Sequence, residues 1–241
     1  MSSDACLALL LDGPMQSWGQ SSRFDRRTTA LHPTRSGVLG LIAAAMGIDK
    51  HGPDEANQIK RFEPLRVTTV ALGRLDRRGD GLPMRRLEDY HTVTGIRRAS
   101  GKVDKDATVQ SYRHYLLDAR FGVLPEGPSA LLEEIAAALR DPKWGVWFGR
   151  KSCLPASPVL AAGPGARAEV WALLLKRAGL PATKALEEFD HVIETTPDDP
   201  AADMIEDTPV GYGRSIGERH APRWIRRVPK SSTSNPQSTM D

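Results

Sequence analysis

The sequence contains few cysteines and no long apolar run. Cys6 and Cys153 are its two cysteines, they lie far apart, and neither belongs to a CxxC motif or lies near a histidine cluster. This pattern excludes a disulfide scaffold and any strong zinc signal. The apolar run at 5–11 is much shorter than a signal peptide or a membrane span. We therefore expect a cytoplasmic protein with reduced cysteines, no membrane association and no bound metal.

The sequence also lacks a complete nucleotide-binding motif. The glycine-rich stretch 211–217, GYGRSIG, has neither the Gly-Lys-Ser/Thr ending of a phosphate-binding loop nor the spacing of a dinucleotide-binding turn. We interpret this stretch as a turn-rich connector. No cofactor and no small-molecule substrate are expected.

The net charge is small but unevenly distributed. A value of +3 does not by itself indicate a nucleic-acid partner. However, residues 187–207 contain many carboxylates and no Lys or Arg, whereas residues 23–35 and 219–230 are rich in cations. A molecule with separate acidic and basic sectors can bind a polyanion on one side. The acidic sector is expected to face solvent or a basic protein partner.

The order of the predicted elements is typical of a ferredoxin-like α+β fold, β-α-β-β-α-β. Hydrophobic periodicity and helix start and stop signals predict a strand, a helix, a strand, a charged projecting insertion, a strand, a helix started and capped by Ser129, and a strand. Their ranges are 5–11, 34–46, 65–72, 74–109, 108–123, 129–140 and 145–148.

The predicted domain organisation follows from this order. Residues 1–158 form the ferredoxin-like domain, with a projecting insertion at about 75–108. Residues 159–228 form a small β-rich C-terminal region with strands at 169–176, 187–194 and 219–228, and residues 229–241 form a mobile polar tail.

The first candidate site lies between the first strand and the first helix. The long connecting segment carries Met15, Trp18 and Phe24 among several arginines, a mixture of stacking surfaces and phosphate-seeking cations. The helix start at 34–37 offers unpaired N–H groups to a phosphate, and Gly37 would let a ligand approach the main chain. Alternatively, Thr34 or Ser36 only caps the helix, the glycines allow tight packing, and Arg35 is solvated.

Two further basic patches are candidates for RNA binding. In the insertion, cations surround Tyr90 and His91, and the interleaving of cations with stacking groups suits single-stranded RNA, although a solvated loop would look similar. The second patch, 150–152, follows the predicted strand at 145–148, where a solvated strand edge is the alternative interpretation.

Four ordered motifs resemble one known family. They are GPMQSWGQ followed by PTRSGVLGLIAAAMGI, then DYHTV at 89–93, YRHYLLDA at 112–119 and GRKSCLP at 149–155. Together they resemble the CasD family, the RAMP-type subunit that holds the 5′ end of the guide RNA in the type I-E CRISPR Cascade complex. The resemblance covers roughly residues 5–160, with a weaker similarity near 223–224.

The resemblance implies a non-catalytic subunit that binds the 5′ handle of the crRNA and caps one end of the backbone-subunit filament. It implies contact of the thumb-like insertion with the guide and with the backbone subunit, contact with the large subunit, and indirect contact with target DNA. The candidate RNA-binding residues are Gln16, Trp18, Arg27, Thr34, Arg35, Ser36, Gly37, Tyr90, His91, Thr92, Thr94, Arg97, Arg98, Arg113, Tyr115, Arg150, Lys151 and Ser152.

Two other functions remain open at this point. Some relatives in type I-C systems cut guide precursors without a metal ion. A cutting site would need a base, an acid and a cation, drawn from Tyr90 or Tyr115, His91 or His114, and Lys102 or Lys151. The other alternative is a protein-protein adaptor whose basic patches bind acidic partner surfaces.

Overall fold

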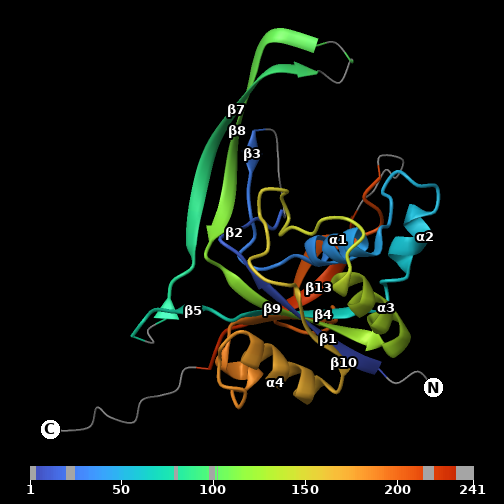
Figure 1. Cartoon of the computed structure of the whole chain (residues 1–241), viewed down its shortest axis with the longest axis vertical. Helices are drawn as coiled ribbons and strands as arrows, with labels where there is room; N and C mark the ends of the chain where they lie inside the picture. Colours follow the sequence, from blue (N-terminus) through green and yellow to red (C-terminus); the bar gives the residue numbers. More distant parts are fainter. Residues whose placement is uncertain are drawn as a thin grey trace, which may run out of the picture.

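The computed structural model describes residues 4–19, 25–78, 81–97, 101, 103–213 and 220–231. Its α+β fold is built on a seven-stranded antiparallel sheet with the strand order β10-β1-β9-β4-β11-β13-β12 (Figure 1). These strands are β1 (Asp4–Asp12), β4 (Arg66–Ala71), β9 (Arg120–Pro128), β10 (Leu160–Gly165), β11 (His191–Thr195), β12 (Asp203–Pro209) and β13 (His220–Val228). The helices are α1 (Arg35–Met46), α2 (Glu55–Lys60), α3 (Ser129–Arg140) and α4 (Arg167–Arg177), with a 3-10 turn at Leu186–Glu188.

Strand β1 is buried on both faces because helices cover both sides of the sheet (Figure 1). Leu7, Leu9 and Leu11 join the core that contains α1 and α3, whereas the alternate residues of β1 pack with α4 on the opposite face. A strand buried on both faces has a continuous apolar sequence, which is why the run at 5–11 is recognisable. Both cysteines are free and buried, and burial raises the pKa of Cys6 to about 12.

Helix α1 forms where the sequence predicts it. Val38, Leu41, Ile42 and Ala45 lie on its buried face, and the helix ends at Gly47, whose left-handed φ of 73° suits a C-terminal cap. The strand predicted at 65–72 and the helix after Pro128 are also present, as β4 and α3. No helix in the described ranges has both the length and the apolar character needed to cross a membrane.

A long hairpin projects from the large sheet (Figure 1). Its strands β7 (Arg85–Arg97) and β8 (Val103–Leu117) pair antiparallel, and a small ribbon of β5 (Arg74–Leu75) and β6 (Gly81–Leu82) precedes it. At the base of the hairpin, β8 also pairs with β2 (Met15–Gln16) and β3 (Arg26–Arg27). The segment after β1 and the insertion, which the sequence presents as separate features, therefore share one sheet.

The prediction of one strand at 108–123 is wrong, because two strands share this range. Strand β8 ends at Leu117, β9 begins at Arg120, and Asp118 between them has a positive φ of 53°. Aspartate tolerates this left-handed conformation better than most residues, so the chain turns here without glycine. The turn transfers the chain from the hairpin sheet to the large sheet.

Three further predictions of local structure are wrong. Residues 145–148 form an irregular segment, and the strand that pairs with β1 is β10 instead. Residues 169–176 lie in helix α4, because Val170, Leu174 and Leu175 form a buried helical face. Helix α3 has Pro128 at its N-cap without a side-chain cap, whereas Ser129 donates to the side chain of Glu133 at 3.4 Å.

The C-terminal strands continue the large sheet. The boundary predicted at residue 158 does not interrupt it, because β10 pairs with β1 and β11 pairs with β4. Of the predicted strand 187–194 only the second half is extended, the predicted strand 219–228 corresponds to β13, and β12 was missed. The predicted tail lies outside the described residues beyond Ser231.

Candidate nucleic-acid interface

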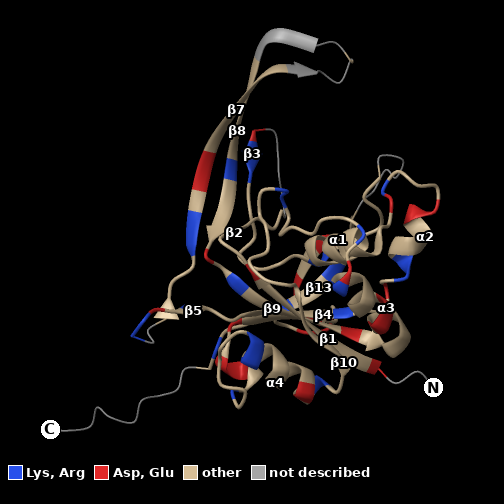
Figure 2. Cartoon of the chain, in the orientation of Figure 1, with Lys and Arg blue, Asp and Glu red and all other residues tan. Residues whose placement is uncertain are grey.

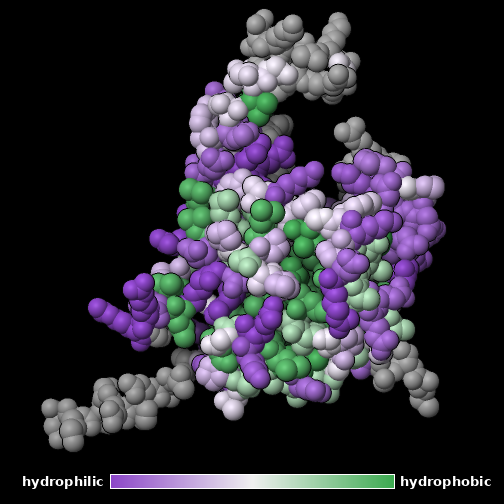
Figure 3. Space-filling view, in the orientation of Figure 1, coloured by the Kyte–Doolittle hydropathy of each residue, from purple (hydrophilic) through white to green (hydrophobic). Residues whose placement is uncertain are grey.

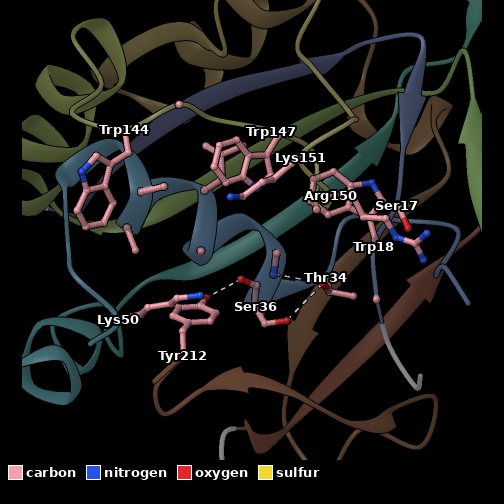
Figure 4. A pocket seen from close by; sticks show the side chains of 18 of the residues that line it. Ser17, Trp18, Thr34, Ser36, Lys50, Trp144, Trp147, Arg150, Lys151 and Tyr212 are labelled. Atoms are coloured by element: carbon pink, nitrogen blue, oxygen red, sulfur yellow. Dashed lines mark hydrogen bonds between the residues drawn. The ribbon is translucent and has the colours of Figure 1, made fainter. Parts of the chain in front are cut away.

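A groove of about 980 Å³ brings together several of the predicted patches (Figure 4). It is lined by the segment before α1, by α1 itself, by the chain after α1, by the base of the hairpin, by residues 144–151 and by Tyr212 and His220. The predicted site residues that line it are Trp18, Arg27, Thr34, Ser36, Gly37, Arg113, Arg150 and Lys151. These residues come from all three candidate regions of the sequence, so the groove is their common location.

Small residues of α1 make the floor of the groove. Ser36, Gly37, Gly40 and Ala44 recur at three- and four-residue spacing, which places them on one face of the helix. The small residues let aromatic side chains pack directly on the helix, because Trp18 lies against Gly37 and Tyr212 lies against Gly40. The opposite face of α1 supplies the apolar contacts to α3 and the sheet.

Arg150 dominates the cationic side of the groove. Its Nη2 donates to the carbonyl of Arg27 at 2.9 Å, and its guanidinium lies 4.8 Å from the centre of the Tyr115 ring. Its Nη1 is shielded from solvent and has no hydrogen-bond partner in the described part of the chain. A buried charged donor without a partner is costly, so this atom favours an incoming anion.

The segment that carries Arg150 is held by a tight turn. Gly149 has a φ of 84°, and a Cβ at this position would overlap the carbonyl oxygen of Ser17. Ser17 N donates to Phe148 O at 3.0 Å, and Cys153 N donates to Arg150 O at 2.8 Å. No residue with a Cβ fits at this position, so both the backbone conformation and the available space require glycine.

Other cations surround the groove. Arg113 is half-buried and donates from Nε to Ser111 Oγ at 3.2 Å, whereas Arg27, Lys50 and Lys151 are exposed. The Lys151 ammonium lies 5.6 Å from the centre of the Trp147 ring. Asp49 is the single carboxylate among the described lining residues. The groove therefore has a strong excess of positive charge.

Sequence reasoning missed three aromatic residues of the groove. Trp147 comes from the segment 145–148 that was interpreted as a strand, Trp144 directly precedes this segment, and Tyr212 comes from the predicted connector. Their signal was available, because both tryptophans precede the basic residues 150–151 closely in sequence. The contribution of Tyr212 depends on contacts between distant parts of the chain and gave no local signal.

Tyr212 is fixed on α1 by two anchors. Its hydroxyl donates to the carbonyl of Ser36 at 2.6 Å, while its backbone N–H donates to the buried carboxylate of Glu55. Gly213 N donates to both Glu55 oxygens at 3.0 Å. Burial, and secondarily the charge of Glu55, raises the pKa of Tyr212, so its hydroxyl remains a donor.

The start of α1 is not a vacant anion site, in contrast to the prediction. Thr34 Oγ1 accepts from Gly37 N at 3.2 Å, and Asp207 Oδ2 accepts from Arg35 N at 2.7 Å. The alternative interpretation of Thr34 as a helix cap is therefore correct. The carboxylate of Asp207 takes the place that a phosphate would occupy.

Arg35 is also committed to the protein interior. It is 4% exposed, and its guanidinium donates to the carbonyls of Phe62 and Leu65 and to Glu194 at 2.6 Å. Arg223 contacts the same Glu194 oxygen at 3.1 Å and forms a bidentate pair with Asp207. The predicted phosphate contact of Arg35 is incompatible with this buried cluster of two arginines and two carboxylates, which we call the charge cluster.

The charge cluster also corrects the expectation for the acidic sector. Glu194 and Asp207 point inward, although Glu187, Asp198 and Glu206 of the same sector are exposed. Asp203 and Asp199 pair with Arg227 and Arg226 of the neighbouring β13. Much of the acidic charge is therefore neutralised by the chain's own C-terminal basic strand.

Three other predicted contact residues belong to the core. Trp18 is fully buried, donates from Nε1 to Gln16 Oε1 at 3.1 Å and packs near Phe148. A Cβ on Gly37 would lie 2.7 Å from the Trp18 ring, so Gly37 allows this packing. Gln16 donates to two backbone carbonyls in the interior, and Tyr115 is buried beneath Arg150. These side chains position the groove and leave no free face for a base.

Tyr90, His91, Thr92 and Thr94 lie on the hairpin and are not among the residues that line the groove. Tyr90 is exposed, its ring lies 5.4 Å from that of Tyr112, and the Arg26 guanidinium covers Tyr112 at 5.2 Å. Thr92 and Thr94 are exposed and His91 is half-buried. The side chain of Arg97 and all of Arg98 lie outside the described residues, as do Arg23 and Phe24. Ser152 is exposed beside Cys153.

Charge and hydropathy differ between the hairpin and the groove region. Figure 2 shows both signs of charge along β7, and His114 contacts Glu88 at 2.6 Å on the hairpin. Figure 3 shows hydrophobic residues in the middle of this face, bordered by hydrophilic residues of the hairpin and of the α2 side. An apolar centre beside the cations that line the groove suits a ligand that has both flat rings and negative charge.

Comparison with known proteins identifies the family. The family described as "CRISPR-associated protein (Cas_Cas5)" matches residues 6–227. The chain belongs to the Cas5 family. A curated relative, the CRISPR system Cascade subunit CasD of Escherichia coli (strain K12), is 35% identical over 150 residues, which span 61% of this chain and 66% of the relative. The match thus spans slightly less than two thirds of the relative's length.

Solved structures agree with this Cas5 assignment. A chain of a CRISPR RNA-guided surveillance complex superposes with a TM-score of 0.70 at 31% identity, covering 93% of this chain and 90% of that one. A structure titled as a Cas protein gives a TM-score of 0.59 at 30% identity, with coverages of 93% and 95%. The resemblance to the CasD family inferred from four sequence motifs is therefore confirmed.

Proposed function

We propose that this Cas5-family protein is an RNA-binding subunit of a type I-E Cascade surveillance complex and holds the 5′ handle of the crRNA in the groove. The observation that carries the proposal is the Nη1 atom of Arg150, a shielded cationic donor that lacks a partner among the described residues and lies at an open groove. A backbone phosphate would supply the missing acceptor.

The composition of the groove supports RNA over an acidic protein surface as the ligand. Arg27, Lys50, Arg113 and Lys151 surround the groove with Arg150, and flat aromatic side chains lie beside them. Single-stranded RNA combines phosphates with exposed base faces, whereas an acidic peptide would need only the cations. The adaptor alternative leaves Trp144 and Trp147 unexplained.

The architecture suggests how the subunit would be placed in a complex. The strand order β10-β1-β9-β4, with connections through α1 and α3, supports the proposal of a ferredoxin-like unit from which the hairpin projects. We propose that the hairpin contacts the guide and the neighbouring backbone subunit, that this subunit caps one end of the backbone filament, and that it also contacts the large subunit. We propose that the complex is cytoplasmic and that this subunit contacts target DNA only indirectly.

The same proposal assigns no catalytic role. Of the groups considered for RNA cleavage, Tyr115 is buried beneath Arg150, His114 is paired with Glu88, and Lys102 lies outside the described residues. Tyr90 and His91 lie on the hairpin, whereas Lys151 lies at the groove. This separation favours binding over metal-independent cutting of repeat RNA.

The test compares Arg150→Ala with Lys176→Ala, which removes the same charge from the exposed end of α4 across the sheet. Retention of labelled 5′-handle RNA is measured over a range of salt concentrations without divalent metal, and the same samples are analysed for cleavage. We expect Arg150→Ala to weaken retention about tenfold and to reduce the salt slope by about one phosphate contact, with no cleavage.

Two outcomes would contradict the proposal. Equal retention by Arg150→Ala and Lys176→Ala would remove the groove as the RNA site. Site-specific cutting of repeat RNA by the unaltered protein would establish a processing enzyme instead of a binding subunit.

A further inference from the structure

One end of the groove differs chemically from the rest. Near Arg150 and Arg113 the groove is cationic, whereas at the other end Trp144, Trp147 and Tyr212 surround the small residues of α1. Trp144 is 41% exposed although it is a large aromatic residue. Figure 4 shows the two tryptophans on one side of α1 and Tyr212 on the other side. Phosphate binding alone does not account for three aromatic side chains.

The local backbone presents these rings to the groove. A Cβ on Gly145 would lie 3.3 Å from the Trp147 ring, so the ring lies close to this turn of the chain. Tyr212 packs on Gly40, where a Cβ would lie 3.2 Å from its hydroxyl. Glu55 and the Ser36 carbonyl hold Tyr212 in this position. The aromatic end is therefore built by contacts from separate parts of the chain.

We infer that the aromatic end of the groove binds one unstacked base of the RNA, and this inference rests on the proposed function. The base lies against Trp144 or Trp147 above the part of the floor formed by Ala44. Its flanking phosphates face Lys50 on one side and Lys151 with Arg150 on the other. Tyr212 is a positioning residue, because its hydroxyl is already used by Ser36.

The physical argument is the match between ring faces and bases. Every base offers an apolar π-face, and stacking on an aromatic side chain contributes to single-strand binding independently of sequence. A base bound here must leave its neighbours, which single-stranded RNA permits. An aliphatic peptide side chain could fill the space, but it would not use the cations that flank it. The excess of Lys and Arg over the single carboxylate Asp49 favours nucleic acid.

The experiment uses the full chain and the 5′-handle RNA, with a series of RNAs in which one nucleotide at a time is abasic. For the unaltered protein, we expect one abasic position to weaken binding roughly 5- to 150-fold, the range that corresponds to loss of one stacked base. For Trp144→Ala or Trp147→Ala, the same abasic position should reduce the RNA affinity only slightly further, because the stacking partner of the base is already missing. The salt slope of these variants should remain unchanged, because no phosphate contact is lost.

Conservative variants separate stacking from folding. Trp144→Phe and Trp147→Phe retain an aromatic face and should restore most of the affinity lost in the alanine variants. Trp171→Phe is the matched control, because Trp171 lies on α4, on the opposite face of the sheet, and donates to Lys184 O at 2.8 Å. RNA should quench the fluorescence of the unaltered protein and of Trp171→Phe, but much less that of the double Trp144→Phe, Trp147→Phe variant.

The outcomes distinguish this inference from the proposed function. If Arg150→Ala weakens binding while the alanine variants of both tryptophans retain full affinity and all abasic RNAs bind equally, the base site is refuted and the phosphate groove stands. If Arg150→Ala and the tryptophan variants all bind like the unaltered protein, the groove itself is the wrong site.

Discussion

The start of α1 and the segment 144–151 look alike in sequence but differ in structure. Each combines cations with glycine beside a hydroxyl side chain, which is Thr34 or Ser36 at the helix start and Ser152 directly after the second segment, and each resembles a phosphate site. At the start of α1, Asp207 and Glu194 already neutralise Arg35 and the helix N-terminus. In the segment 144–151, Arg150 keeps a shielded Nη1 without a partner in the described chain. The difference shows that a cationic motif is available to a ligand only if the fold has left its charge uncompensated.

The strongest way to test this comparison is to break the charge cluster. In Arg223→Ala, Asp207 loses its bidentate partner, and Glu194 loses one of its two arginines. Asp207 is only 3% exposed, so water cannot replace the lost partner easily. We expect the free energy of unfolding to fall by about 3–5 kcal/mol, the usual cost of removing one partner of a buried ion pair. Urea denaturation measures this change.

The matched control is Arg227→Ala on the same strand. Arg227 pairs with Asp203, but both side chains are about half exposed, so we expect a loss of at most about 1 kcal/mol. RNA affinity of either variant should be unchanged under conditions where it is folded. Similar destabilisation by both substitutions would show that the charge cluster has no special structural role.

A second substitution tests the support of the Arg150 segment. Gly149→Ala places a side chain at a φ of 84° against the Ser17 carbonyl, so we expect a stability loss of about 1–3 kcal/mol together with weaker RNA retention. Gly179→Ala is the control, because Gly179 has a similar φ of 69° with open space around it. Thermal unfolding and RNA retention are measured for both. Retention unchanged in Gly149→Ala would show that this turn does not position Arg150.

Sequence patterns predicted the elements that have local signals. The doubly buried β1, the helical periodicity of α1 and the breakers around α3 are each contained in a few adjacent residues. The errors arose where distant contacts decide the structure. Residues 145–148 have strand-like side chains but no neighbouring strand, and β10 takes the position next to β1.

The same reasoning explains the partial success at the site. Cations and aromatic residues near one another are visible in sequence, and eight of the predicted residues line the groove. Their charge compensation is not visible, because Asp207 lies 172 positions from Arg35. Sequence likewise did not show that Trp18 and Tyr115 are buried, since burial depends on how the hairpin base packs against α1.

The smallest expected effect concerns His32, which lies beside the charge cluster. Burial, the main cause, lowers the pKa of His32 below its usual 6.5, and Arg223 and Arg227 act in the same direction. The Pro33 carbonyl, which accepts from Nδ1, and Asp207 oppose this shift. Because the unfolded chain binds the proton more readily, stability should be full above about pH 6.5 and decline as the pH falls below it.

His32→Gln should make this decline shallower, since it removes the titrating group. Urea midpoints of both proteins between pH 7.5 and 5.5 measure the difference. His51→Gln is the control, because His51 is exposed and away from the charge cluster. Identical pH profiles for His32→Gln and the unaltered protein would assign the acid sensitivity to other groups.

Strand β8 runs without interruption from the outer hairpin to the core. Along its length it pairs with β7, carries Arg113 into the groove, pairs with Arg26–Arg27 and places Leu116 in the core just before it ends at Leu117. If occupancy of the groove changes the angle of this strand, a partner that engages the hairpin must in turn change the affinity of the groove by the same factor. Assembly and ligand retention would then reinforce or oppose each other through a single β-strand.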